Sequence, residues 1–193
     1  MGKDGVVAER NLYPLFLSLE GRKVLVVGAG SVAERKVEDL LLAGARVHVV
    51  APRASKRLRE LGKDRSIAWS ARTYAAADLD DAWLVVSATG SRSIARRVFK
   101  DAEERRIFVL AVDDPKHGSA ISSSVVRRAP FVVAISSSGH APALTRLLRE
   151  LIEQILPEDH WIRAARDLRA RWRAESVPMG SRFAELVRTF KAR

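Results

Sequence analysis

The glycine-rich turn Gly28-Ala29-Gly30-Ser31-Val32-Ala33 constrains the fold of this chain more than any other feature. It follows a short apolar run, Lys23 to Val27, which is typical of a strand buried on both faces. After the turn, apolar residues recur at helical spacing as far as Gly44, the type of residue that often ends a helix. A second apolar run follows at 46–50. The sequence therefore predicts strand, helix and strand within about 30 residues, the size of one βαβ unit.

A turn of this kind, between a strand and a helix, favours binding of a dinucleotide. Gly28 permits the tight turn, Gly30 lets the backbone approach a pyrophosphate, and Ala33 is small enough for the helix to pack on the sheet. The free N–H groups at the helix start then face the phosphates. We predict a cofactor site formed by residues 28–33. The alternative is a glycine turn in an α/β protein that binds no nucleotide.

The end of the second strand leaves the choice of cofactor open. Many NAD-specific domains carry an acid there to bind the ribose hydroxyls. Here Val50 and Ala51, which we place at the cofactor site, are followed by Pro52 and Arg53 without an acid. Arg53 is either a partner for the 2′-phosphate of NADP or an ordinary solvated charge.

The rest of the chain predicts a parallel sheet followed by a different kind of structure. Apolar runs at 83–89 and 107–112 flank a predicted helix over 91–105, which indicates a parallel α/β sheet. The next apolar segments have no helix between them, so we expect them to pair antiparallel; they are Ala120-Ile121 with Val125-Val126, and 131–135. A helix is predicted from Pro142 to Leu156, and a basic helical tail follows, interrupted at Pro178-Met179-Gly180.

Composition limits the classes of partner and site. The net charge of +11 attracts polyanions, which include nucleic acid, an anionic membrane surface and a multiply acidic small molecule. A compositional bias towards arginine explains the same charge without any ligand. The chain has no cysteine, which excludes thiolate metal sites and cysteine nucleophiles, and its four histidines lack metal-ligand spacing, so we predict no metal site. With neither a signal peptide nor a membrane-spanning apolar stretch, the sequence predicts a cytoplasmic protein.

Two polar loops carry candidate site residues. Asp113 and Asp114 follow a predicted strand, where a carboxylate can exchange a proton with a ligand; the alternative is an acidic turn before proline. The stretch Ser136-Ser137-Ser138-Gly139-His140 precedes a helix and can hold an anion, although a serine-capped helix start explains it more simply. His117 lies in the first of these loops. We interpret His117 and His140 as structural, with contact to a substrate or metal as the alternative.

Together these segments resemble the precorrin-2 dehydrogenase/sirohydrochlorin ferrochelatase family, which includes the N-terminal module of siroheme synthase. The similarity covers about residues 11 to 157. The matching segments are Leu12-Tyr13-Pro14-Leu15-Phe16-Leu17-Ser18-Leu19-Glu20-Gly21-Arg22, Val26 through Lys36, Ala88-Thr89, Val112-Asp113-Asp114-Pro115, Val133 through Ser136, and Gly139-x-Ala-Pro142 with Leu144-x-Arg146-Leu147-Leu148-Arg149.

The resemblance implies an α/β fold class, with a Rossmann-type parallel sheet domain, a small dimerisation region and a helical C-terminal region. We expect the boundaries 1–112 for the NAD(P)-binding Rossmann domain, 113–142 for the dimerisation and active-site region, and 143–193 for the helices. A homodimer is implied as well. The implied activity is NAD-dependent oxidation of precorrin-2, a tetrapyrrole, to sirohydrochlorin in siroheme or cobalamin biosynthesis.

The same resemblance assigns site residues. The essential aspartate of the family corresponds to Asp113, which we predict to manage protons on the macrocycle. The cofactor site gains Ala88 and Thr89. The substrate carries many carboxylates, so the predicted substrate-binding residues include two basic side chains: they are Ser136, Ser137, Ser138, Gly139, His140, Arg146 and Arg149.

Two further activities stay open at this point. Some family members also insert ferrous iron into sirohydrochlorin, and one aspartate can serve both reactions. A hypothesis from another class is a nucleotide sensor or nucleic-acid-binding protein, which the basic tail motivates. The tail shows no clear recognition helix, so we expect no nucleic-acid partner.

Overall fold

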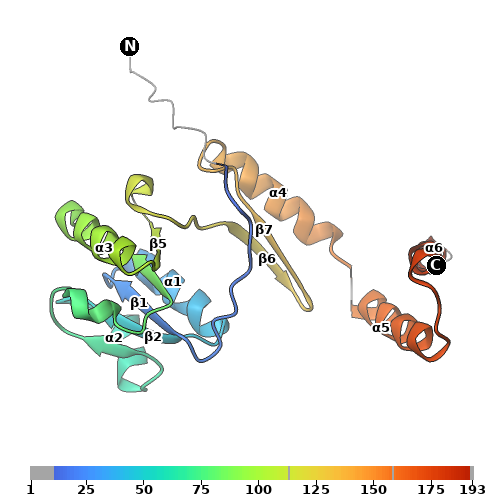
Figure 1. Cartoon of the computed structure of the whole chain (residues 1–193), viewed down its shortest axis with the longest axis horizontal. Coiled ribbons are helices and arrows are strands. Elements are labelled where there is room, and N and C mark those ends of the chain that lie inside the picture. The colour runs from blue at the N-terminus through green and yellow to red at the C-terminus, as the bar shows by residue number, and fades with distance from the viewer. Residues whose placement is uncertain (1–10, 113, 158, 192–193) are drawn as a thin grey trace, which may run out of the picture. The chain divides into compact units, whose positions relative to one another are not determined.

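A computed structural model describes residues 11–112, 114–157 and 159–191 of the chain. The chain divides into two compact units, Met1–Ser122 and Ser123–Arg193. Figure 1 shows the elements of both units. Each unit is described by itself below.

The first unit is built on a five-stranded parallel sheet in the order β3-β2-β1-β4-β5. The strands are β1 Lys23–Val27, β2 Arg46–Val50, β3 Ala68–Ser70, β4 Leu84–Ser87 and β5 Phe108–Ala111. The chain runs from β1 outward to β3 and then returns to β4 on the other side of β1. In open α/β sheets, ligands bind outside the carboxyl ends of the strands at such a reversal point.

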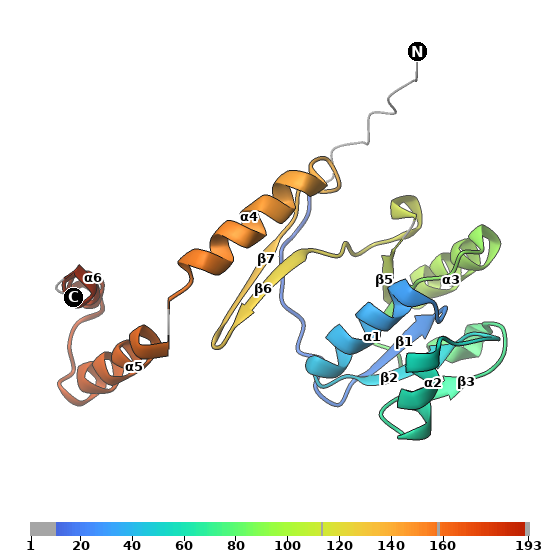
Figure 2. The ribbon, with the colours of Figure 1, turned by 180° about the vertical axis from the view of Figure 1, so that it is seen from behind.

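Helices cover both faces of this sheet (Figures 1 and 2). They are α1 Ser31–Leu42, α2 Lys56–Lys63 and α3 Arg92–Glu104, with short 3-10 turns η1 Ala76–Leu79 and η2 Pro115–His117. Side chains of a strand alternate between faces, so β1 contributes to two apolar clusters. Val24 and Val26 pack in one cluster with residues of α1 and α2, whereas Leu25 and Val27 pack in the other with residues of α3.

Side chains bond the amino-terminal edge of the sheet to the neighbouring loops. The Lys23 ammonium donates to the backbone carbonyls of Asp78 at 3.0 Å and Asp80 at 2.6 Å. The Arg22 guanidinium lies over the Trp83 ring, 3.5 Å from its centroid. Arg46 Nε donates to the Gly21 carbonyl at 2.7 Å. These contacts hold together the starts of β1, β2 and β4.

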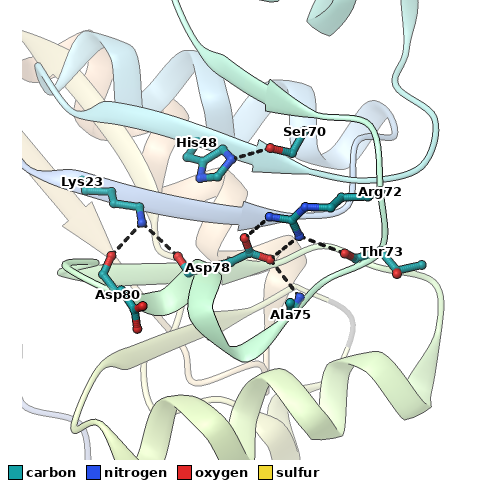
Figure 3. Close-up of polar contacts among 8 residues, drawn as sticks. All are labelled: Lys23, His48, Ser70, Arg72, Thr73, Ala75, Asp78 and Asp80. Carbon is teal, nitrogen blue, oxygen red and sulfur yellow. Dashed lines mark hydrogen bonds and ion pairs between the residues drawn. The ribbon is translucent and has the colours of Figure 1, made fainter.

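A polar cluster beside β2 and β3 holds the connection to β4 (Figure 3). Arg72 donates from both terminal nitrogens to the Asp78 carboxylate, at 2.8 and 2.5 Å, and the Ala75 N–H donates to the same group at 2.8 Å. These bonds, above all those from Arg72, lower the pKa of Asp78. His48 lies 3.0 Å from the Ser70 hydroxyl, and burial lowers its pKa, as does the Lys23 charge. His48 of β2 thus makes a structural contact to β3 within the sheet.

The second unit combines an antiparallel hairpin with three helices. Strands β6 Ser124–Arg128 and β7 Phe131–Ile135 pair around the turn at Ala129-Pro130. Helix α4 Pro142–Ile155 packs on the hairpin, mainly along β6. Helices α5 Asp159–Ala174 and α6 Met179–Lys191 contact each other. Between them Trp172 Nε1 donates to the Glu185 carboxylate at 2.6 Å.

The predicted fold class is confirmed, with one difference in detail. We expected Ala120-Ile121 to belong to an antiparallel strand, and this was wrong. The N–H groups of Ser119 and Ala120 both donate to the Val109 carbonyl at 2.9 Å, and Ala120 forms a parallel bridge with Leu110. The segment therefore follows the free edge of β5, and the hairpin begins only at Ser124. The three-part domain division remains a prediction.

Candidate functional site

The glycine turn lies at the carboxyl edge of the sheet, where the chain reverses between β1 and β4. Gly28 has φ +106°, a conformation that L side chains rarely adopt. A Cβ at this position would lie 2.2 Å from the carbonyl oxygen of Ala88. The Gly28 N–H donates to the Val50 carbonyl at 3.0 Å, and the Ala88 N–H donates to the Val27 carbonyl at 2.9 Å. The structure thus brings together Gly28, Val50 and Ala88, three of the predicted cofactor residues.

The start of α1 fits a dinucleotide phosphate group. Gly30 is the N-cap of α1, and no side chain caps the helix there. A Cβ on Gly30 would meet no heavy atom within 4 Å, so the space beside this residue is open. The first N–H groups of a helix, here those of Ser31, Val32 and Ala33, lack acceptors inside the helix. Their positive end and the open space form a cradle suited to a pyrophosphate, which a Cβ would partly fill.

The end of β2 forms the next part of this edge. Ala51 N–H donates to the Ser70 carbonyl at 3.2 Å, and the Ala51 carbonyl accepts from Trp69 Nε1 at 3.2 Å. The Ser55 N–H donates to Ala29 at 3.1 Å, which ties the start of α2 to the glycine turn. Arg53 is exposed on the loop between them. The geometry therefore leaves both explanations of Arg53 open.

A pocket lies at the carboxyl ends of β4 and β5. Its volume is about 620 Å³. The lining comes from the end of β4, the start of α3, the end of β5 and the loop through η2; the residues are Ser87, Thr89, Gly90, Arg92, Ala95, Arg96, Ala111, Asp114, Lys116 and His117. We call it the β4–β5 pocket. Thr89, a predicted cofactor residue, belongs to this pocket, where its hydroxyl accepts from the Ser91 N–H at 3.2 Å.

Asp114 and His117 form a hydrogen-bonded pair in the wall of the β4–β5 pocket. His117 Nδ1 lies 2.7 Å from the Asp114 carboxylate, which also accepts from the Lys116 N–H at 3.2 Å. The bond from His117 lowers the pKa of Asp114, and the charge on Arg92 acts in the same direction. The His117 ring packs edge-on against Phe99 of α3 at 5.8 Å between centroids. The loop is thus fixed to the helix beside the pocket.

The predicted catalytic Asp113 lies outside the described residues, between Val112 and Asp114. Its assignment therefore stays a prediction. Among the described residues, no group of three or more His, Cys, Asp or Glu side chains is arranged to hold a metal ion. In the same part of the chain, no helix has the length and hydropathy needed to cross a membrane.

The predicted substrate residues belong to the second unit, and their hydrogen bonds are mostly local. The Ser137 hydroxyl accepts from the Ala141 N–H at 3.1 Å and from the Thr145 hydroxyl at 2.9 Å. The Ser138 N–H donates to the Ser136 hydroxyl at 3.1 Å, and the His140 N–H donates to the Ser137 carbonyl at 2.9 Å. These bonds match the simpler explanation, a serine-stabilised turn before a helix.

The two predicted substrate-binding arginines have acidic neighbours on their own helix. Arg146 Nε lies 3.0 Å from the Glu150 carboxylate, and Arg149 bonds to Glu153 at 2.9 Å. Both pairs are four residues apart on α4, a spacing that supports exposed helices. A substrate carboxylate would have to compete with these partners.

Sequence reasoning missed the charged residues of the β4–β5 pocket. The sequence pattern predicts an acidic turn or a proton-exchanging carboxylate at Asp114, and a structural loop histidine or a contact to substrate or metal at His117, but not the bond between them. Arg92, Arg96 and Lys116 drew no attention. One signal was present, because Arg92 and Arg96 are four residues apart at the start of a helix that follows a buried strand.

Comparisons with known proteins agree with this geometry. A family model described as putative NAD(P)-binding matches residues 15–124, and one described as sirohaem biosynthesis protein central matches residues 133–155. The chain is 46% identical over 171 residues to siroheme synthase 3 of Aeromonas hydrophila, which is 88% of this chain and 36% of that protein. It is 42% identical over 163 residues to siroheme synthase of Neisseria meningitidis, covering 84% and 34%. The chain spans about a third of the length of these curated relatives.

A solved structure has the same fold along most of the chain. It is described as SirC, precorrin-2 dehydrogenase, and superposes with a TM-score of 0.74. The match covers 92% of this chain and 88% of that one at 24% sequence identity. The likeness therefore extends beyond the parallel sheet.

Proposed function

Because the chain belongs to the putative NAD(P)-binding family and is related to siroheme synthases, we propose that it oxidises precorrin-2 to sirohydrochlorin with NAD. The observation that carries the cofactor assignment is the open cradle at Gly30 in front of the start of α1. The substrate assignment rests on the relatives, and the name of the solved neighbour agrees with it.

The reaction removes two hydrogens from the substrate. When bound, NAD supplies the acceptor for one of them as a hydride. The second hydrogen leaves as a proton and needs a base. We assign this role to Asp113, because it corresponds to the essential aspartate of the family that the sequence resembles, and a carboxylate can accept a proton.

The residues of the first unit bind and orient the cofactor in this proposal. The N–H groups of Ser31, Val32 and Ala33 hold the pyrophosphate. Gly28 sets the direction of the turn against Ala88, and Val50 and Ala51 at the end of β2 would help to hold the bound cofactor. Substrate carboxylates are held in part by the predicted residues at 136–140 and by Arg146 and Arg149, in competition with the glutamates of α4.

The test is anaerobic absorbance with precorrin-2 and NAD. We expect the sirohydrochlorin spectrum to appear only when NAD is present. Asp113→Ala should abolish turnover and leave the Kd for NAD unchanged, whereas the exposed control Asp64→Ala should keep full turnover. Turnover retained by Asp113→Ala would remove Asp113 from the mechanism, and no turnover in the native protein would reject the proposed reaction.

A second activity follows from the name of the relatives, since siroheme contains iron. We propose that the chain also inserts ferrous iron, as substrate, into sirohydrochlorin. The assay adds ferrous ion to sirohydrochlorin without NAD and compares the rate with that of the uncatalysed reaction. An equal rate would limit the chain to the dehydrogenation.

We further propose a homodimer formed through the second unit. Helix α4 has no buried residue among those described, and an apolar stripe runs along it: Leu144, Leu147, Leu148, Leu151 and Ile155. Exposed leucines at this spacing are typical of a helix that packs on another protein surface. The double change Leu147→Arg and Leu151→Arg should give a monomer in sedimentation, whereas Glu153→Arg on the charged side of α4 should not. A native monomer at micromolar concentration would contradict the proposal.

The alternative of a nucleotide sensor or nucleic-acid-binding protein makes different predictions. It requires salt-sensitive binding of random DNA and no tetrapyrrole binding.

The cytoplasm remains the proposed location.

A further inference from the structure

Among the residues that the structure describes, the lining of the β4–β5 pocket holds more cationic side chains than carboxylates. Arg92, Arg96 and Lys116 line it, and Asp114 contributes the one carboxylate among the described lining residues. That carboxylate already accepts from His117 at 2.7 Å and from the Lys116 N–H at 3.2 Å. Each of its oxygens therefore already accepts one hydrogen bond.

The cations of α3 fall into two groups that differ in their partners. Those outside the pocket lie near carboxylates: Arg97 is 3.7 Å from Asp101, and Lys100 is 3.9 Å from Glu104. Within the described residues, Arg92 and Arg96 form neither an ion pair nor a side-chain hydrogen bond. The α3 cations that line the pocket thus lack a direct ion pair within the described residues, and Arg92 acts on the Asp114 carboxylate only through its charge.

The spacing of these two arginines strengthens the argument. Arg92 and Arg96 are four residues apart on α3, so they are neighbours on the helix surface. Like charges at this spacing destabilise a helix, whereas the pairs Arg97–Asp101 and Lys100–Glu104 stabilise the same helix. An anion bound between the two guanidinium groups would turn this repulsion into attraction.

We propose that the β4–β5 pocket is the subsite that binds a carboxylate of the substrate, held by Arg92 and Arg96. This inference rests on the proposed function, because it takes the acidic tetrapyrrole as the ligand. Arginine suits the role, since its planar guanidinium binds a carboxylate with two parallel hydrogen bonds. Lys116, in the 3-10 turn η2, adds a third charge to the lining.

The same oxyanion chemistry has a second source, the phosphates of the dinucleotide. The pocket is lined by Thr89 and Gly90 at the end of β4, whereas the phosphate cradle lies at the start of α1 after β1. Thr89 is also a predicted cofactor residue, so one side of the pocket adjoins the cofactor site; we assign its arginines to the substrate and leave the phosphates at the glycine turn.

The experiment measures the binding of two ligands to three forms of the full chain. The ligands are sirohydrochlorin and NAD, titrated separately at low ionic strength. The variants are Arg92→Ala with Arg96→Ala, and the matched control Arg97→Ala with Lys100→Ala, which removes the same charge from the same helix. We expect the first variant to raise the Kd for sirohydrochlorin about tenfold or more. The control should change it less than twofold, and the Kd for NAD should change in neither.

A conservative variant separates charge from a change in fold. Arg92→Lys with Arg96→Lys keeps both charges and loses the planar fork, so its Kd for sirohydrochlorin should lie between native protein and the alanine variant. Thermal unfolding of all forms identifies a variant that fails to fold. Should the alanine variant fail, the lysine variant decides, with an unchanged Kd counting against the subsite.

The outcomes distinguish this inference from the proposed function. An unchanged Kd for sirohydrochlorin in the alanine variant overturns the subsite, and so does a loss confined to NAD, which would place the phosphates in the pocket. A native protein that does not bind sirohydrochlorin rejects the proposed function. In that case benzenehexacarboxylate serves as the probe, and binding that weakens only in the pocket variant keeps a carboxylate subsite for another acidic ligand.

Discussion

Two glycines of one turn should respond differently to the same substitution. In Gly28→Ala the new Cβ would lie 2.2 Å from the Ala88 carbonyl at φ +106°. Strained backbone costs about 1–3 kcal/mol and overpacking costs about as much again, so we expect a loss of about 2–5 kcal/mol in the free energy of unfolding. In Gly30→Ala the Cβ meets nothing within 4 Å. Because Gly30 is the N-cap of α1 and alanine is a poorer cap, we expect a loss of about 1 kcal/mol or less.

For the binding of NAD, we expect Gly30→Ala to have a clear effect even though it changes stability little. Gly30→Ala places a methyl group in the open space before α1, so we expect the Kd for NAD to rise about tenfold or more, equivalent to about 1.4 kcal/mol. Denaturant unfolding and calorimetric titration with NAD measure the two quantities. A Gly30→Ala variant that binds NAD with native affinity would refute the assignment of the cradle. A Gly28→Ala variant of native stability would refute the steric argument.

Other predictions concern stability. Asp78→Asn should cost about 1–3 kcal/mol at neutral pH, because two bonds from the half-exposed Arg72 are weakened. The pKa of Asp78 is lowered in the folded chain, so its ionised carboxylate stabilises the fold fully above the unfolded pKa of about 4, and this stabilisation is lost as the pH falls through the folded pKa. Denaturant unfolding of the native protein and of Asp78→Asn measures it. A difference in the free energy of unfolding that is equal at pH 7 and pH 2 would contradict the prediction. Trp172→Phe should remove the bond to Glu185 and weaken α5–α6 packing by about 1 kcal/mol, visible as earlier hydrogen exchange in α6; unchanged exchange would show that the bond is not needed.

The parallel sheet and its glycine turn were predictable because local signals specify them. A buried strand reads as an apolar run, the following helix changes the period to 3.6 residues, and Gly28 has a backbone conformation that excludes most other residues. The helix over Pro142–Ile155 was equally readable from its apolar stripe and its flanking prolines. Each of these features depends on residues that are close in sequence.

The pocket charges and the polar cluster were not predictable, because their meaning depends on packing. Nothing in the spacing of Arg72 and Asp78 shows that this pair is bidentate, since it depends on the route of the β3–β4 connection. The segment at Ser119 and Ala120 was misjudged for a similar reason. Its N–H groups bond to Val109, a strand edge that a sequence pattern does not reveal.

The bonds at the start of β1 and the cradle at its end lie at opposite edges of the same sheet. Lys23 and Arg22 hold the amino-terminal edge together, while Gly28 and Gly30 form the carboxyl edge. Five residues of strand separate the two by about 15 Å, beyond the range over which substitutions usually interact. Substitutions that stabilise the amino-terminal edge should therefore not alter ligand binding at the carboxyl edge. Evolution or protein engineering can thus change stability at the amino-terminal edge and ligand preference at the carboxyl edge independently.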